Sequence, residues 1–540
     1  MEKVQEQSKN TKKTQSLLSK GLSLSVLTLL SRILGLVREV TKARFLGTQA
    51  LSDAFGIAFQ IPNFFRRLFA ENSVSVAFIP TFKASLEDCG TEDGKRQTLE
   101  FVNATFTLLT FLTSVFVALG MIFTPLILRI FFAKNADTLQ EAAVLTRIMF
   151  PYLVVISIAA LFQGILNGLK IFSPSGFTPI LFNSIVIACT YILAPFTKNP
   201  ARAMAIGVIS GGCVQALFQL PFVIKNGWRL SFTSLKKAFT NPKTRTVLKL
   251  IGPTIIGMAA YQLNDIVSSS LATRAGTGVY SSIQYSLRLQ ELILGICAVT
   301  IGTVILPDLT GFAKKCDWNN FESLLSQSVK IMALIAIPIT FYSLIMGRNI
   351  ITLIFARGAF DENSIEMTEK VFLCHIIGLF FIAVNRIVSP AFYAQGDTKN
   401  PTIAGLLNFA TNISLAWILV GPLSGQGIAT ALSVASFVNT AFLFIFLARK
   451  KNIQVKKIIK EIALYSAKII TFSVIALLPL YFFHTGIESF FFKYTASRPV
   501  ICQGLTVFVT GFIFAFIGLG LLLITKDDIL KSAANKIRRK

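Results

Sequence analysis

Histidines, paired cysteines and nucleotide-binding motifs are scarce or missing in this 540-residue chain, and each shortage excludes a class of site. The two histidines, His375 and His484, cannot by themselves build a metal site or a catalytic triad. The seven cysteines are scattered and include no C-x-x-C pair, which argues against a disulfide framework or a zinc ribbon. Neither a Gly-Lys-Ser/Thr phosphate loop nor a His-Glu-x-x-His motif occurs. The sequence therefore does not indicate an enzyme, and His375 is expected to be a packed or hydrogen-bonded residue.

Charged residues are also few, and this sets the class of protein. They make up 14% of the chain, against about 25% in soluble domains, while 53% of the residues are hydrophobic. The mean hydropathy is +0.65. Residues 400–448 contain no Asp, Glu, Lys or Arg, and this stretch is long enough for two helical spans and a turn. These features predict an all-α polytopic membrane protein.

Basic residues outnumber acidic ones by 52 to 26, and their positions indicate topology rather than nucleic-acid binding. They gather before the first apolar stretch, in the segment 225–249, in the segment 449–460 and at the carboxyl terminus. Lysine-rich loops of membrane proteins stay in the cytoplasm. We therefore expect both termini and both internal basic segments to be cytoplasmic, and no nucleic-acid partner.

Hydropathy, with breaks at Gly, Pro and charge clusters, predicts about fourteen transmembrane helices. Their expected ranges are 22–46, 51–82, 97–132, 143–169, 177–197, 203–224, 247–273, 279–312, 322–346, 368–394, 401–420, 426–448, 460–484 and 501–525.

Short sequence echoes indicate an internal repeat. Residues 78–82 (FIPTF) correspond to 305–309 (ILPDL), and 130–133 (IFFA) correspond to 353–356 (LIFA), at an offset of about 220–230 residues. Parallel repeats of this kind are a transporter architecture, with the substrate site between the halves. We expect two six-helix lobes followed by two extra helices. The predicted segments are a basic segment 1–21, a first lobe 22–225, a basic linker 226–246, a second lobe 247–450, two extra helices 451–525 and a basic tail 526–540.

The first two expected spans carry charges that membrane helices normally lack. Arg32 and Arg38 lie in the first, and Asp53, Asn63 and Arg66 lie in the second. An arginine at bilayer depth costs about 2.5–3.5 kcal/mol on insertion scales, so it normally faces a polar cavity. Several of them together predict a cationic, water-filled chamber, and an anionic cargo. The alternative is that they extend to the interface or neutralise nearby acids, which explains Arg44 and Arg67 equally well.

The eighth expected span carries a polar stripe. Ser281, Gln284, Arg288 and Glu291 are spaced so that all four fall within about an 80° sector of a helix. Unpaired polar groups are costly in lipid, so this stripe is expected to face other polar groups. Because the planar fork of arginine matches phosphate oxygens, a phosphate-bearing ligand is the natural cargo.

A second polar cluster is expected in the carboxyl-terminal half. Asp265 lies among Gln262, Asn264 and two serines, and Asn408 and Asn412 lie one helical turn apart. Carboxylate, amide and hydroxyl oxygens can bind a hard cation such as sodium. A hydrogen-bonded structural cluster is an equally good interpretation.

Several of these motifs together resemble one family, the MurJ (MviN) lipid II flippases of the multidrug/oligosaccharidyl-lipid/polysaccharide exporter superfamily. The motifs are residues 31–39 (SRILGLVRE), 53–55 (DAF), 62–71 (PNFFRRLFAE), 285–291 (YSLRLQE) and 302–307 (GTVILP). The resemblance covers essentially the whole chain. It departs at Gln60, where some members carry a basic residue.

The resemblance implies a transporter that moves lipid II, an undecaprenyl-diphosphate-linked disaccharide-peptide, outward across the bacterial cytoplasmic membrane. It implies that residues matching Arg32, Arg38, Arg66 and Arg288 line a central cavity, supported by those matching Asp53, Asn63, Ser281 and Glu291. The last two helices would carry the lipid tail. No cofactor is implied beyond sodium in some members; membrane lipids and other cell-wall synthesis proteins are the expected partners. The alternatives are an exporter of another polyprenyl-linked oligosaccharide or of drugs, and a membrane-embedded glycosyl- or acyltransferase.

Overall fold

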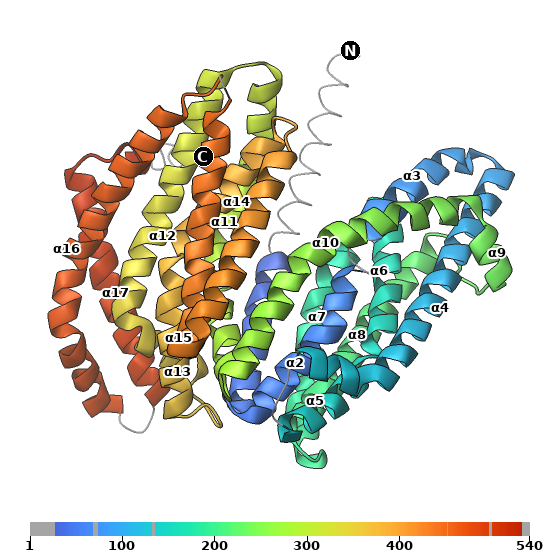
Figure 1. The fold of residues 1–540 in the computed structure, drawn as a ribbon, viewed down its shortest axis with the longest axis horizontal. Coiled ribbons are helices and arrows are strands. Elements are labelled where there is room, and N and C mark those ends of the chain that lie inside the picture. The colour runs from blue at the N-terminus through green and yellow to red at the C-terminus, as the bar shows by residue number, and fades with distance from the viewer. Residues whose placement is uncertain (1–26, 69–73, 132–135, 451, 496–498, 532–540) are drawn as a thin grey trace, which may run out of the picture. The chain divides into compact units, whose positions relative to one another are not determined.

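In a computed structural model the described residues, 27–68, 74–131, 136–450, 452–495 and 499–531, are almost entirely helical (Figure 1). Helical residues 27–46 come first. The helices that follow are α2 (Ala50–Arg66), α3 (Ile79–Glu87), α4 (Glu92–Phe131), α5 (Ala136–Met149), α6 (Tyr152–Gly168), α7 (Ser173–Leu193), α8 (Pro200–Lys225), α9 (Leu235–Thr240), α10 (Pro242–Ala275), α11 (Val279–Lys314), α12 (Trp318–Phe355), α13 (Glu362–Ile377), α14 (Leu379–Tyr393), α15 (Lys399–Ala448), α16 (Val455–Thr495) and α17 (Pro499–Ile524).

Many of these helices are long and apolar enough to cross a membrane. Among the described residues eight helical segments meet this condition, or nine if α13 and α14 form one bent span. α17 is the most apolar of them, and 17% of its apolar window is buried within the protein. The chain is therefore an all-helical, multi-pass membrane protein, as the sequence predicted.

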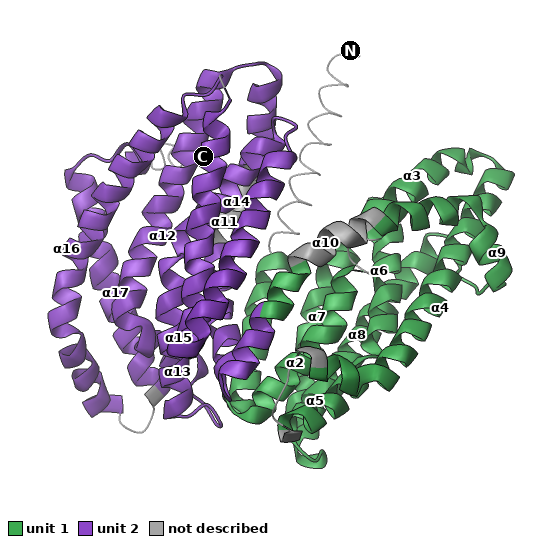
Figure 2. Ribbon diagram, in the orientation of Figure 1, with its two compact units in different colours: residues 1–267 green, residues 268–540 purple. Residues whose placement is uncertain are grey.

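Two compact units divide the chain, residues 1–267 and 268–540 (Figure 2). The boundary falls inside α10. In the first unit, α8 packs on α6 and α7, and the core centres on buried phenylalanines such as Phe78, Phe82 and Phe101. Gly168 permits a close approach here, because a Cβ atom at this position would lie 2.6 Å from the ring of Phe82. In the second unit, α12 packs against α13, α14, α16 and α17.

Three of the long helical regions contain breaks. Within α15, Ser424 has φ 50° and ψ −127°, which divides the segment close to the predicted break between spans 401–420 and 426–448. The predicted continuous span 368–394 is instead α13 and α14, bent by 43° at Gly378. The predicted span 143–169 is instead α5 and α6, which are separated at Pro151. The helical region also starts earlier than predicted, because α5 begins at Ala136.

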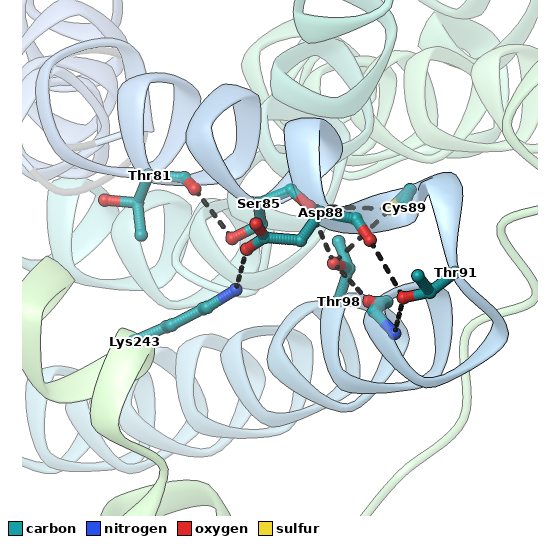
Figure 3. A network of polar contacts seen from close by, with 8 residues as sticks. Thr81, Ser85, Asp88, Cys89, Thr91, Thr98 and Lys243 are labelled. Atoms are coloured by element: carbon teal, nitrogen blue, oxygen red, sulfur yellow. Dashed lines mark hydrogen bonds and ion pairs between the residues drawn. The ribbon is translucent and has the colours of Figure 1, made fainter.

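The basic segment 226–246 is docked along α4 rather than extended from the unit. Trp228 packs edge-on against Phe82 at 5.0 Å between ring centroids. The backbone N–H of Ser231 donates to Asn103 Oδ1 at 3.0 Å. At the start of α10, Lys243 Nζ lies 3.7 Å from Asp88, beside a network in which Thr98 donates to the Ser85 carbonyl (Figure 3).

Candidate functional site

Arg38 lies in the helix 27–46 and is held by groups from two helices. Its Nη1 donates to Asn183 Oδ1 of α7 at 3.1 Å, and its Nη2 pairs with Glu39 Oε1 at 2.8 Å. Its guanidinium carbon also lies 5.9 Å from the ring centroids of Phe59 and Phe182. The arginine side chain is 21% exposed. These contacts fix the direction of a charged fork that is mostly buried in the first unit.

Other charges of this helix are partly or fully buried. Arg32 is partly buried. Lys42 is buried, and the carboxylates of Glu39 and Asp53 both attract its ammonium group. Asp53 is itself 4% exposed. Arg44 lies over the ring of Tyr191 at 5.4 Å, which agrees with the packing interpretation for this residue.

In α2, Arg66 and Asn63 form a local pair. Arg66 Nε donates to Asn63 Oδ1 at 2.7 Å, so the predicted common side of these residues is confirmed. Pro62 lies inside α2 just before them, and the α-helix ends at Arg66. Glu71 lies outside the described residues.

Arg67 and Asp265 form a second charged pair within the first unit. Arg67 Nη1 lies 3.5 Å from Asp265 Oδ2 and donates to Gln262 Oε1 at 3.2 Å. Gln60 Nε2 donates to the Asp265 carbonyl at 3.2 Å. The side chains of Arg67 and Asp265 are 39% and 49% exposed, so solvent screens the pair and its net contribution is about 0–1 kcal/mol.

In the second unit the polar stripe lies on α11. Arg288 Nη1 is 3.4 Å from Glu291 Oε2, and the two side chains are 28% and 60% exposed. Gln284 is partly buried, whereas Ser281 is fully buried. The stripe therefore passes from the core at Ser281 toward exposed charge at Glu291.

The amides proposed for a cation lie on α15. Asn412 Nδ2 donates to Ser268 Oγ at 3.3 Å, so the predicted proximity of Asn412 to the serines after Asp265 is found within the second unit. The buried Oδ1 of Asn408 has no hydrogen-bond partner in the described part of the chain. A sodium site formed by Asp265, Asn408 and Asn412 stays a prediction.

Comparison with known proteins decides the family. A family model described as "Lipid II flippase MurJ" matches residues 42–497. A "Probable lipid II flippase MurJ" of Treponema pallidum is 46% identical over 532 residues, covering 98% of this chain and 99% of that one. The chain belongs to the MurJ lipid II flippase family. A "Lipid II flippase MurJ" of Burkholderia cenocepacia is 33% identical, covering 80% of this chain and 84% of that one.

Solved structures agree on the fold. "Lipid II flippase MurJ, inward closed conformation" superposes with a TM-score of 0.75 at 24% identity, covering 94% of this chain and 99% of that one. An inward-facing MATE family transporter of the MOP superfamily gives a TM-score of 0.64 at 13% identity, covering 80% of this chain and 96% of that chain. The fold is therefore the one that MurJ and MATE transporters share, and membership of the family makes this chain a transporter rather than an enzyme.

The sequence did not assign Asn183 to the site, although it is a direct partner of Arg38. Its signal was available, because an asparagine in the middle of the apolar α7 needs a hydrogen-bonding partner. Gln262 and Gln60 were noticed in the sequence, but their contacts with Arg67 and Asp265 were not predicted.

Proposed function

We propose that this MurJ family protein moves lipid II from the inner to the outer leaflet of the bacterial cytoplasmic membrane by alternating access. The diphosphate of the head group is bound by guanidinium groups, while the polyprenyl tail stays in the membrane along α16 and α17. No covalent bond is made or broken.

The observation that carries the binding role is the environment of Arg38. Its contacts with Asn183 and Glu39 use two of the five N–H donors of a guanidinium. The other donors can serve an anion, and because the side chain is already oriented, binding loses less conformational freedom. Arg32, Arg66 and Arg288 would supply further bonds to the phosphates, with Asp53, Asn63, Ser281 and Glu291 orienting them.

The proposal includes a finer membrane arrangement of fourteen spans. Helices 27–46, α2, α4, α5 with α6, α7 and α8 would form the first six. α10, α11, α12, α13 with α14, and the two parts of α15 would form the next six, before α16 and α17. Both termini and the segment 226–246 would be cytoplasmic. Reporters fused after residue 540 and within 230–243 should both report cytoplasm, and an external signal at either position would contradict this arrangement.

The test of function is replacement of an essential flippase. In a strain depleted of its own lipid II flippase, this gene should restore growth and restore the appearance of lipid II in the outer leaflet, measured by labelling of externalised precursor. Growth without externalised lipid II would contradict the proposal that lipid II is the substrate. Restored export of a different polyprenyl-linked oligosaccharide alone would favour another exporter of the superfamily.

A further inference from the structure

The break between α13 and α14 leaves the last turn of α13 without its usual helical partners. Gly378 N–H donates to the His375 carbonyl at 3.2 Å, three residues back, so it does not continue the α-helical pattern to Cys374. The final carbonyls of a helix need hydrogen-bond donors from elsewhere. Inside a membrane protein an unsatisfied carbonyl is especially costly.

Side chains from other helices of the same unit supply these partners. Ser433 of α15 donates to the Cys374 carbonyl at 2.7 Å. Gln290 of α11 donates its amide to the His375 carbonyl at 2.6 Å. The hydroxyl of Thr340 in α12 lies 3.2 Å from the Ile376 carbonyl and 2.9 Å from the Ala336 carbonyl of its own helix. The broken turn is thus a junction at which three helices bind one backbone segment.

The side chain of His375 makes a second hydrogen bond with α11. Ser286 Oγ and His375 Nδ1 lie 2.6 Å apart and share one hydrogen, which confirms that His375 is a hydrogen-bonded residue. Ser286 and Gln290 are one helical turn apart on the same face of α11, and they are 0% and 3% exposed. Beside them Tyr285 is fully buried against Phe355, at 5.1 Å between ring centroids.

The polar stripe lies on the other side of this anchored face. At 100° per residue, Arg288 is about 160° from both Ser286 and Gln290. Arg288 and Glu291 form an ion pair with each other on α11 itself, so that pair does not fix the rotation of the helix. The rotation is fixed by the face that carries Ser286 and Gln290.

We infer that Ser286 and Gln290 are positioning residues, which bind α11 to the broken turn of α13 and so fix the direction in which Arg288 and Glu291 project. The importance of that direction rests on the proposed function, whereas the coupling itself does not. Gly378 is part of the same junction, because a Cβ atom there would lie 2.5 Å from Ser433 Oγ and 2.8 Å from Ser433 Cα. The close approach of α15 therefore requires glycine at the break.

The test measures the rotation of α11 directly. Single cysteines are placed at 288, 289 or 291 in a full-length chain whose seven native cysteines are replaced. A membrane-impermeant thiol reagent should react faster at 288 and 291 than at 289, since Leu289 is 3% exposed. Adding Gln290→Met keeps the length of the side chain but removes the donor. The ratio of the rates at 288 and 289 should then fall by about two- to tenfold, the equilibrium shift that one net hydrogen bond supports.

A matched control separates positioning from general loosening. Gln219 in the first unit is also buried, and it donates to the Ala159 carbonyl at 3.3 Å. Gln219→Met should leave the 288-to-289 ratio unchanged. Ser286→Ala, a smaller change, should lower the ratio in the same direction as Gln290→Met. An unchanged ratio in both α11 variants, or an equal fall in the Gln219 control, would overturn the inference.

A binding measurement distinguishes a failure of the proposed function from a failure of the positioning role of Ser286 and Gln290. Purified Gln290→Met protein with its native cysteines should bind lipid II more weakly than the parent, because Arg288 is misdirected. If Arg288→Ala does not weaken lipid II binding, the proposed function fails, while the labelling ratio still decides the positioning role.

Discussion

The two units hold their arginines in different ways. In the first unit Arg38 is fixed through its own side chain, by Asn183 of another helix and by Glu39. In the second unit Arg288 has a looser pair on its own helix at 3.4 Å, and the helix is fixed by neutral hydrogen bonds on its opposite face. The direction of a guanidinium can thus be fixed in two ways. Either the arginine side chain itself is bound, or the helix that carries the arginine is bound through other residues. Arg38 uses two of its N–H donors in these contacts, whereas Arg288 uses one, in its longer bond to Glu291.

The largest effect is expected when one arginine is removed from each unit. The double variant Arg66→Ala, Arg288→Ala should abolish complementation, because losing each charge-assisted bond costs about 1.5–3 kcal/mol. Lysine should replace arginine only partially where the fork binds two oxygens at once. Growth of the depleted strain and lipid II export are the measurements.

The control for this prediction is a surface arginine. Arg96 pairs with Glu100 and is 79% exposed, so Arg96→Ala should support normal growth. Immunoblots of membranes should show both proteins at parental abundance. Normal export by the double variant would end the anionic-cargo mechanism for both units.

A smaller effect should distinguish the two ways of holding arginine. Asn183→Ala removes a partner of Arg38 and should lower lipid II affinity about 10- to 100-fold, as expected for a hydrogen bond to a charged group. Glu291→Gln should lower it by no more than about fivefold, because that pair is largely exposed. The measurement is lipid II binding to purified protein.

Asn226→Ala is the control for this pair, since Asn226 is exposed and its side chain donates to the Phe222 carbonyl of the helix that it ends. It should bind lipid II as the parent does. Equal losses in Asn183→Ala and Glu291→Gln would remove the contrast between the units.

The sodium prediction addresses the charge pair of the first unit. If Asp265 takes part in a cation site, sodium should raise the melting temperature of the parent, and Asp265→Asn should abolish that rise without unfolding the protein. A ligand at 100 times its Kd stabilises by about 2.7 kcal/mol. Potassium at the same ionic strength is the control. If sodium has no effect on the parent, the pair of Asp265 with Arg67 is structural.

The smallest effect is expected at a loop outside the spans. Asp397 accepts from Lys450 Nζ at 2.7 Å and from Asn400. Burial raises the pKa of Asp397, but the bonds to Lys450 and Asn400 outweigh it, so the pKa is held below its usual value. A lowered pKa stabilises the folded state above the unfolded value, about 3.9, and this contribution disappears as the pH falls through the folded value.

Asp397→Asn should therefore lower the melting temperature at pH 7, by the equivalent of about 1 kcal/mol or less. The difference from the parent should shrink below about pH 3.9. Lys450→Gln should give the same pattern. A difference that stays constant from pH 7 to pH 3 would show that the charge of Asp397 is not the cause.

Much of the fold follows from local sequence signals. The break in α15 was predicted because Gly421, Pro422 and Gly425 interrupt an apolar run, and Ser424 is where the helical backbone ends. The break at Gly378 was not predicted, because a single glycine is common in transmembrane helices. Its cause is tertiary: Ser433 lies against Gly378 and donates to the Cys374 carbonyl, one turn earlier in α13.

The same distinction applies to the site. Arg66 and Asn63 were correctly paired because residues three apart share a helix face. The contact of Arg38 with Asn183 joins residues 145 apart, and no periodicity within one helix predicts it. Gln290 and Ser286 lie within the recognised motif 285–291, but their partner His375 could be found only from the fold.

The docked segment 226–246 has a consequence for biogenesis. Trp228, Ser231 and Lys243 all bind residues that precede them in the chain, namely Phe82, Asn103 and Asp88. These contacts can form as soon as the segment leaves the ribosome, before residue 268 and everything after it has been inserted. The segment can therefore dock on the first unit during synthesis, before the ribosome has made the second unit.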